Sequence, residues 1–287
     1  MQKSTKVLLL VLAILVLINA VIWYAVIRNQ RDGTLTVSFL NIGQGDATFI
    51  ESPSGVQVLI DGGKGRAVLR ELSGVMPWFD RSIDVVIGTH PDQDHIGGLP
   101  DVLARYRVST VLRSSVLDEE GSDFAAFNEA IAKEKESGGV EMIAERGQVF
   151  DLGDGATLTI LFPDRDVPGL ETNTGSVVAR LKYGNTSFML TGDSPQSIEE
   201  YLVRLDGEAL HSSVLKAGHH GSRTSSSPLF VGFVDPEYAV FSRGCDNSYG
   251  HPHEEVVELF KRFEVQTRDT CDGRVTFVSD GQSVRTR

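Results

Sequence analysis

Hydrophobic residues fill one continuous stretch near the start of the chain, whereas later they alternate with polar residues. Over residues 7–27 the only clearly polar side chain is Asn19, and such a run is long enough to cross about 30 Å of hydrocarbon as a helix. Trp23 and Tyr24 lie near its end, where aromatic rings favour a membrane interface. The pattern predicts a transmembrane anchor, preceded by a short cytoplasmic end at residues 1–6.

A cleaved signal peptide is the alternative for this segment. Its apolar core is typically about 7–15 residues long and is followed by a small-residue cleavage site. Here the core is longer, and the sequence WYAVIRNQRDG offers no clear A-x-A pattern, so an uncleaved anchor is favoured. Lys3 and Lys6 precede the segment, whereas Arg28 and Arg31 follow it and are diluted by Asp32. This bias places the N-terminus inside and the larger part of the chain outside.

After a short linker at residues 28–33, apolar positions recur with the periods of strands and helices. Predicted strands cover residues 34–43, 46–52, 56–63, 83–90, 108–115, 156–163, 176–184, 186–193, 213–218, 238–244 and 274–279. Predicted helices cover residues 67–76, 98–106, 123–137, 195–205 and 253–263, with Ser194 as the cap of the fourth. Strands interleaved with helices in both halves favour one α/β domain over residues 34–287, built as a four-layer αββα sandwich.

The charge of this domain restricts the kind of partner that it binds. Residues 1–30 contain three basic side chains and no acid, so residues 31–287 carry 24 basic and 39 acidic side chains, a net charge of −15. Proteins held to nucleic acid by bulk electrostatics are usually basic. Tight, non-specific DNA binding is therefore not expected, and attraction for a polyanion must be local to the site.

Two cysteines occur, Cys245 and Cys271. Outside the cytoplasm a disulfide between them is one reading, and two isolated small hydrophobic side chains are the other. Connectivity depends on geometry, so the sequence leaves both readings open.

Histidines are clustered in a way that suggests a site. Six of the seven occur in the stretches HPDQDH, GHHGS and YGHPH, each after a predicted strand, and only His211 stands apart. Loops over a rigid sheet are common positions for binding and catalytic groups.

The stretch HPDQDH begins where a buried strand ends. In an extended loop His90 and Asp92 project to one side, while Asp94 and His95 lie a turn further along. Four such groups without a partner would be costly to bury, and a divalent cation is the partner that satisfies all of them. A solvated acidic loop is the alternative, but the glycines that follow permit a close backbone approach before the next helix.

Two further stretches carry complementary groups. Asp193 ends a strand; alone it would be an ordinary acid at a helix N-terminus, but beside a cation site it can bridge two metals. His219 and His220 are adjacent, so in a loop they diverge and one of them is expected to be a ligand. Lys216 and Arg223 give this edge local positive charge.

The last stretch places His251 and His253 at the start of a helix. His253 is equally well explained as an ordinary residue at a helix N-terminus. His251, between a glycine and a proline, is better placed to meet an anion or a leaving-group oxygen.

Together these stretches resemble the metallo-β-lactamase fold, and more narrowly the metallo-hydrolase domain of the ComEC competence proteins. The resemblance covers roughly residues 34 to 286 and rests on FLNIGQGDATFIESPSG, VLIDGG, THPDQDHIGGL, NTGSVVARLKYGNTSFMLTGD, LKAGHHGSRTSS, NSYGHPHEEV and DGRVTFVSDG. It implies an αββα sandwich with a dinuclear centre at one edge. Full competence proteins of this kind also carry a channel region, so only the hydrolase part is carried over.

The resemblance also implies a set of ligands. His90 and Asp92 serve one metal, Asp94 and His95 the other, Asp193 lies between them, and His219 is the remaining ligand, with His220 on the substrate side. Asp92 stands where lactamase-type members have a second histidine, and no histidine falls between His95 and Asp193. The first metal position therefore departs from the family pattern, as does Asn41 where an aspartate is usual.

The expected activity is that of a membrane-anchored, metal-dependent phosphodiesterase or nuclease that uses metal-activated water on nucleotides or on DNA, single-stranded DNA included. Zn²⁺ or Mn²⁺, as one or two ions, suits three histidines and three aspartates. The expected location is a bacterial cell membrane, crossed once, with the catalytic domain outside the cytoplasm. The expected catalytic groups are Asp94, His220, His251 and Lys216, and the expected substrate-binding groups are Arg223, Ser222, Asn173, Ser176 and His253. Two alternatives remain: a hydrolase of esters, lactones or β-lactams, and a binding module that keeps the fold without turnover.

Overall fold

The computed structural model describes residues 2–28, 33–118, 120–167 and 169–287. Its contacts divide the chain into two compact units, residues 1–32 and 33–287. In the first unit, α1 (Gln2–Arg28) is one continuous helix. Its segment Thr5–Tyr24 is long and apolar enough to cross a membrane, a test that signal sequences also pass, so α1 is a possible span.

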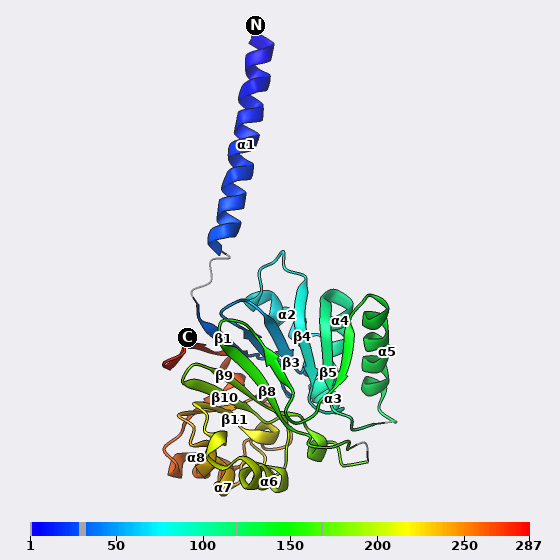
Figure 1. Ribbon diagram of the computed structural model, residues 1–287, viewed down its shortest axis with the longest axis vertical. Helices are drawn as coiled ribbons and strands as arrows, with labels where there is room; N and C mark the ends of the chain where they lie inside the picture. The colour runs from blue at the N-terminus through cyan, green and yellow to red at the C-terminus, as the bar shows by residue number, and fades with distance from the viewer. Residues whose placement is uncertain (1, 29–32, 119, 168) are drawn as a thin grey trace. The chain divides into compact units, whose positions relative to one another are not determined.

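The second unit contains two β-sheets and their covering helices (Figure 1). The strands are β1 (Leu35–Phe39), β2 (Thr48–Glu51), β3 (Gln57–Ile60), β4 (Ser82–Gly88), β5 (Arg107–Arg113), β6 (Val140–Ile143), β7 (Val149–Asp151), β8 (Ala156–Phe162), β9 (Val178–Tyr183), β10 (Thr186–Leu190), β11 (Val214–Lys216), β12 (Tyr238–Phe241), β13 (Gln266–Asp269), β14 (Val275–Ser279) and β15 (Val284–Thr286). The α-helices are α2 (Ala67–Val75), α3 (Gln93–Ile96), α4 (Leu99–Arg105), α5 (Ser122–Glu136), α6 (Gln196–Asp206), α7 (Pro228–Val234) and α8 (Glu254–Arg262). Short 3₁₀ turns are η1 (Asn173–Gly175), η2 (Gly207–Leu210), η3 (Gly218–Gly221) and η4 (Thr270–Asp272).

The strand order brings the ends of several parallel strands to common edges. Within the described residues the first sheet has the order β15-β14-β1-β2-β3-β4-β5-β6 and the second the order β13-β12-β11-β10-β9-β8-β7. β3 to β6 pair in parallel, and so do β10 to β13, so each set ends at one edge of its sheet. Loops that leave these carboxyl ends are the usual positions of ligand sites in such sheets.

Alternating burial along the strands explains the layers. In β4 the side chains of Val85 and Ile87 pack into the core between the two sheets. Val86, on the opposite face, packs against residues of α2, α4 and α5. A third core joins the second sheet to α6, α7 and α8. Both faces of β4 are therefore buried, as expected of a parallel strand, and the predicted four-layer αββα sandwich is confirmed.

The structure adds elements that the sequence pattern did not predict, namely β6, β7, β13, β15, α7 and α3, which lies in the stretch expected to be an extended loop. The predicted cap of α6 is wrong by one position, because Pro195 precedes the helix in an extended conformation and the Ser194 hydroxyl has no hydrogen-bond partner among the described residues.

Candidate metal centre

Loops from both sheets meet at the carboxyl ends of β4, β10 and β11. His95 lies in α3, just after β4, Asp193 follows β10, and His220 follows β11. Asp46 comes from a fourth loop, between β1 and β2. Each of these four side chains is buried and offers a ligand atom, and the four atoms all lie within 4.8 Å of one another. We call these four residues the central cluster.

Asp193 is the carboxylate on which the imidazoles converge. Its Oδ2 atom lies 3.2 Å from Nε2 of His95 and 3.4 Å from Nε2 of His220. On the other side of its ring, His220 places Nδ1 at 3.2 Å from Oδ1 of Asp46. The Nε2 atom of His219 approaches the same Asp193 oxygen at 3.7 Å.

Hydrogen bonds behind the two buried imidazoles fix which nitrogen faces the cluster. Nδ1 of His220 lies 2.8 Å from the carbonyl oxygen of Ser242. Because a carbonyl oxygen only accepts hydrogen bonds, this Nδ1 atom carries the hydrogen. Nδ1 of His95 lies 2.8 Å from Oδ2 of Asp61, and this carboxylate also accepts bonds from Thr89. In the neutral rings Nε2 therefore carries the lone pair, as in metal-binding histidines held by a carboxylate or carbonyl.

Lone pairs and carboxylate oxygens facing one another across a buried space repel unless a positive charge lies between them. The Nε2 atoms of His90, His95 and His220 are buried and have no hydrogen-bond partner among the described residues. Nitrogen and carboxylate donors without thiolate suit Zn²⁺ or Mn²⁺. The residues present therefore fit a divalent cation.

The pKa values in the central cluster reflect the same electrostatic arrangement. Burial by itself raises the pKa of Asp193, but His220 and His95 outweigh it and hold the pKa well below its usual range. Burial lowers the pKa of His220, yet Asp193 and Asp46 raise it to about 9. The pKa of His95 is likewise raised well above its usual range, because Asp193 and Asp61 outweigh the lowering effect of burial. The carboxylates therefore favour positive charge on both imidazoles. The same environment stabilises a bound cation.

Lys216 is buried beneath the cluster rather than open to substrate. Its ammonium contacts Asp46, lies 3.3 Å from Oδ1 of Asp193 and donates to the carbonyl oxygen of Gly192 at 2.7 Å. Although burial lowers the pKa of Lys216, the two carboxylates raise it further, so the ammonium is retained. This charge offsets part of the negative charge that the aspartates concentrate there.

His90, Asp92 and Asp94 form a second group beside the central cluster. The rings of His90 and His95 lie 4.0 Å apart, and Nε2 of His90 lies 3.7 Å from Oδ2 of Asp92. Asp94, which is about one-third exposed, places Oδ2 at 3.3 Å from Nε2 of His220. Burial raises the pKa of Asp94, but His220 and His95 lower it to about 2.

Ser176 connects this second group to Asp193. Its hydroxyl lies 3.2 Å from Nδ1 of His90 and accepts the backbone N–H of Asp193 at 3.2 Å. Asn173 lies in η1, three residues earlier, and its Oδ1 atom is buried without a hydrogen-bond partner among the described residues. Of the two expected polar residues, Ser176 is thus brought into direct contact with His90 and Asp193.

His219 and Arg223 lie at the rim, whereas Ser222 is buried. His219 is partly exposed, and its Nδ1 atom lies 3.1 Å from the Thr224 hydroxyl, which donates to the Ser222 hydroxyl. Arg223 is exposed, with its guanidinium 3.6 Å from Glu255. Sequence reasoning assigned His219 as the ligand and His220 as its substrate-side neighbour; the geometry instead brings His220 into the central cluster and leaves His219 at its edge.

His251 also faces the rim, and its neighbours are imidazoles. Its ring lies 5.6 Å from that of His219, and its buried Nδ1 atom has no hydrogen-bond partner among the described residues. Burial, together with His219 and His220, lowers the pKa of His251 to about 4, so the ring is neutral at pH 7. His253 lies further out and accepts the backbone N–H of Arg223 at 3.1 Å.

Sequence reasoning missed two residues of the site, Asp46 and Asp61. The sequence contained a signal for both, because each lies in a glycine-containing stretch, GQGD or LIDGG, where the glycines allow a close backbone approach. Gly45 has a φ of 121°, and a Cβ there would lie 2.0 Å from the Asp94 carbonyl oxygen. The close approach of the two backbones at Gly45 lets the Asp46 N–H donate to the Asp94 carbonyl oxygen at 3.0 Å. Glycine is therefore required at position 45.

The backbone at His219 and His220 is unusual as well. Their φ angles are 48° and 56°, the left-handed region that residues other than glycine rarely adopt. Each such residue costs on the order of 1–3 kcal/mol and persists where surrounding contacts hold it. Strain of this kind is typical of functional sites.

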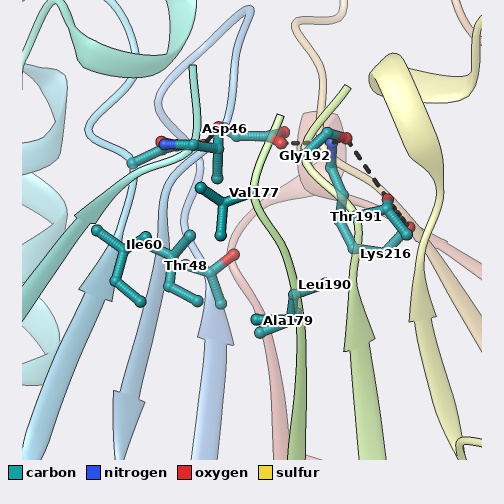
Figure 2. A pocket seen from close by; sticks show the side chains of 12 residues that line it. Asp46, Thr48, Ile60, Val177, Ala179, Leu190, Thr191, Gly192 and Lys216 are labelled. Atoms are coloured by element: carbon teal, nitrogen blue, oxygen red, sulfur yellow. Dashed lines mark hydrogen bonds and ion pairs between the residues drawn. The ribbon is translucent and has the colours of Figure 1, made fainter. Parts of the chain in front are cut away.

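The space beneath the cluster is closed. A cavity of about 10 Å³ lies between the sheets, lined by Asp46 and Lys216 at one end and by apolar side chains such as Ile60, Val177 and Leu190 (Figure 2). This volume holds about one water molecule. The cavity is therefore too small to hold a substrate.

A disulfide holds the loop that carries His251. Cys245 and Cys271 are bonded, with their Cα atoms 4.9 Å apart, which settles the question that the sequence left open. Within the same loop, Asn247 donates to the His251 carbonyl oxygen and accepts the His251 N–H. The position of His251 is thus fixed by the loop and not by the ring itself.

Comparison with known proteins places this geometry in a family. The model of the metallo-β-lactamase superfamily matches residues 40–244. ComE operon protein 3 of Bacillus subtilis is 28% identical over 82% of this chain and 31% of its own length, and competence protein ComA of Neisseria gonorrhoeae is 31% identical over 77% and 28%. Recombination protein 2 of Haemophilus influenzae is 29% identical over 86% and 29%. The chain thus spans about a third of the length of these curated relatives.

Among solved structures, the metallo hydrolase Igni18 of Ignicoccus hospitalis superimposes with a TM-score of 0.56 at 17% identity, over 84% of this chain and 98% of its own. At that identity the likeness concerns the fold alone. The fold and the buried Asp/His cluster, which fits a divalent metal, support a metal-dependent hydrolase. The chain belongs to the metallo-β-lactamase superfamily, with relatives among the ComEC-type competence proteins.

Proposed function

We propose that this protein is a metal-dependent phosphodiesterase that cleaves DNA or nucleotides. The proposal depends mainly on one observation, the convergence of the unpartnered Nε2 atoms of His95 and His220 on Asp193. The names of two of the curated relatives refer to competence and to recombination, which are processes of DNA, and this supports the substrate class.

The proposed ligands divide into two groups. His95, Asp193 and His220, with Asp94 at the open side, hold the principal metal, and Asp46 supports it from behind. His90 and Asp92 are the proposed ligands of a second position, and Ser176 connects His90 to Asp193. The longer distance of 3.7 Å between His90 and Asp92 and the exposure of Asp92 favour weaker binding there.

A divalent cation in such a site supplies a Lewis acid and a nucleophilic water at neutral pH. The protein's own groups prepare the position for it. Asp61 and the Ser242 carbonyl orient the two imidazoles, and Lys216 limits the repulsion between Asp46 and Asp193. We therefore propose Lys216 as a positioning residue, because its three contacts lie within the site.

The rim groups are proposed to receive the phosphodiester. Arg223 offers an exposed guanidinium for phosphate oxygens. His251 is neutral at pH 7, so its role is that of a hydrogen-bonding group toward the leaving oxygen rather than a fixed positive charge. Tyr249 stacks on His251 with ring centroids 5.6 Å apart and is 64% exposed, which offers a surface for a nucleobase.

The protein is proposed to be anchored by α1, with the N-terminus in the cytoplasm and the hydrolase domain outside. The charge bias around the apolar segment supports this orientation. The disulfide between Cys245 and Cys271 supports it independently, because such bonds persist in oxidising compartments and are rare in the cytosol.

The decisive experiment uses the full chain in detergent, stripped with a chelator and reloaded with Zn²⁺ or Mn²⁺. Labelled single-stranded DNA and bis-nitrophenyl phosphate are offered beside an ester, a lactone and a β-lactam. We expect metal-dependent cleavage of the two phosphodiesters, and its loss in Asp193→Asn.

The other outcomes discriminate between the alternatives. Turnover confined to the ester, lactone or β-lactam contradicts the phosphodiesterase proposal. Stoichiometric metal binding with no turnover on any substrate identifies a binding module instead.

A further inference from the structure

Two neighbouring aromatic side chains project into solvent from the loop between α2 and β4. Trp78 is 80% exposed and Phe79 is 47% exposed, and their rings contact each other edge to face with centroids 5.7 Å apart. We call this pair the aromatic tip. Neither ring is buried in the domain. A single exposed apolar residue is common and needs no explanation, whereas here two aromatic rings are exposed together.

The position of the aromatic tip in the sheet is informative. β1 and β2 are antiparallel, as are β2 and β3, whereas β3 and β4 are parallel, so β1 and β4 begin at the same edge. The aromatic tip immediately precedes β4 and therefore lies at this edge, as the loop between α2 and β4 shows in Figure 1. The metal centre lies at the opposite edge, where β4 ends.

The chain enters the domain at the edge of the aromatic tip. The carbonyl oxygen of Gly33 accepts a hydrogen bond from the Tyr183 hydroxyl at 2.8 Å, which fixes the entry point just before β1. Five residue steps separate Gly33 from Arg28 at the end of α1, and they extend over at most about 18 Å. If α1 spans a bilayer, the membrane surface is tethered within that reach of the entry point.

Positive charge accompanies the aromatic tip in an otherwise acidic domain. Arg81 follows it after Asp80, whose carboxylate accepts hydrogen bonds from Gln57 and Ser82. Arg105 ends α4 and Arg107 begins β5, and the Arg107 N–H donates to the Arg81 carbonyl oxygen at 2.9 Å. All three side chains are exposed, and none forms an ion pair with another residue of the described ranges. Aromatic rings flanked by arginine are typical of surfaces that meet anionic headgroups.

We propose that Trp78 and Phe79 insert into the interface of the bilayer that α1 spans, with Arg81, Arg105 and Arg107 against anionic headgroups. The domain is then held at two points, and its metal centre faces away from the membrane. The inference depends on the proposed anchoring by α1, so its test has to report on both.

The two tryptophans of the chain allow such a test, because one lies in α1 and the other in the aromatic tip. The full chain is reconstituted into vesicles of phosphatidylcholine with or without phosphatidylglycerol, containing lipids brominated at known depths. Trp23→Phe leaves Trp78 as the only tryptophan, and Trp78→Phe leaves Trp23. Emission is measured as a function of bromine depth.

We expect Trp78 emission to shift to shorter wavelength and to fall about twofold with shallow bromines, with less quenching by deep ones. The effect should be larger in the vesicles that contain phosphatidylglycerol, and Arg81→Gln combined with Arg107→Gln should remove that difference. The Trp78→Phe protein should show quenching of Trp23 in both lipids.

Quenching of Trp23 without any change at Trp78 overturns the inference and leaves the anchor intact. Absence of quenching at Trp23 overturns the anchor and the inference with it. A Trp78 shift that depends on protein concentration but not on brominated lipid identifies a second copy of the chain as the occupant and overturns the membrane assignment.

Discussion

At the scale of single residues, adjacency in sequence does not imply shared surroundings, as His219 and His220 demonstrate. The left-handed backbone at both positions turns His220 inward to Asp46 and Asp193, while His219 remains at the rim. The two residues therefore form a matched pair for testing the ligand set.

We expect His220→Ala to lower metal affinity by at least ~100-fold, because it removes a ligand whose orientation is fixed by the Ser242 carbonyl. His219→Ala should change affinity by less than about tenfold, because its closest cluster contact is 3.7 Å. Metal content after dialysis and competition with a chromophoric chelator measure both. A larger loss in His219→Ala would restore the assignment expected from sequence.

Glu199 offers a pH-dependence test away from the metal ligands. It is buried in α6 and accepts the N–H groups of Ser226 and Ser227 at 2.7 and 2.6 Å. Burial raises its pKa from 4.5 to about 7, more than those two bonds lower it. The folded state therefore holds a proton that the unfolded chain releases above pH 4.5, so stability falls as pH rises from about 4.5 to 7 and then levels off.

Glu199→Gln should remove that part of the pH dependence, on the order of 3 kcal/mol between the two limits. The measurement is urea unfolding of both proteins in chelator at several pH values, with the difference between their unfolding free energies as the readout. Because the other titrating groups are common to both proteins, parallel profiles would contradict the raised pKa.

At the scale of elements, the disulfide and its surroundings link the ends of β12 and β13. Cys245 and Cys271 join the two loops, and Arg243 pairs with Asp269 at 2.7 Å beside them. β13 has the sequence QTRD, so its pairing with β12 receives little support from apolar burial. A covalent link is therefore valuable at this edge of the sheet.

Replacing both cysteines by serine should lower the free energy of unfolding by about 3 kcal/mol, the value expected for closing a loop of this length. Denaturant unfolding at fixed metal concentration measures it, with the oxidised parent protein as reference. Metal affinity should stay within about tenfold, since no central-cluster residue lies in this loop. Loss of metal binding would show instead that the loop supports the centre.

The same elements show how far the sequence predicts the fold. Strands such as β4, with continuous apolar residues, and helices such as α5, with regular spacing, are evident from pattern alone. The edge strands β7 and β13 are not, because short, half-exposed strands need few hydrophobic residues. Histidine clustering located the site, but which imidazole turns inward depends on backbone angles, and Asp46 becomes a cluster member only when two distant loops meet.

At the scale of the whole molecule, the proposed substrate and the domain carry charge of the same sign. Residues 31–287 have a net charge of −15, and the exposed Arg223 lies 3.6 Å from Glu255, which offsets its charge. Proteins that bind DNA through many phosphate contacts lose about 10³–10⁵ in affinity between 50 and 200 mM salt. For this acidic domain, the same rise in salt concentration screens the long-range repulsion between the domain and DNA.

We therefore expect the KM for single-stranded DNA to fall, or to change by less than about twofold, between roughly 50 and 200 mM salt. The KM for bis-nitrophenyl phosphate should stay constant, because that substrate carries a single charge and reaches the same site. Steady-state kinetics on both substrates with the metal-loaded full chain measure the comparison. A KM for DNA that rises by orders of magnitude, with the small substrate unaffected, would reveal an extended basic DNA track and contradict recognition confined to the metal centre and its rim.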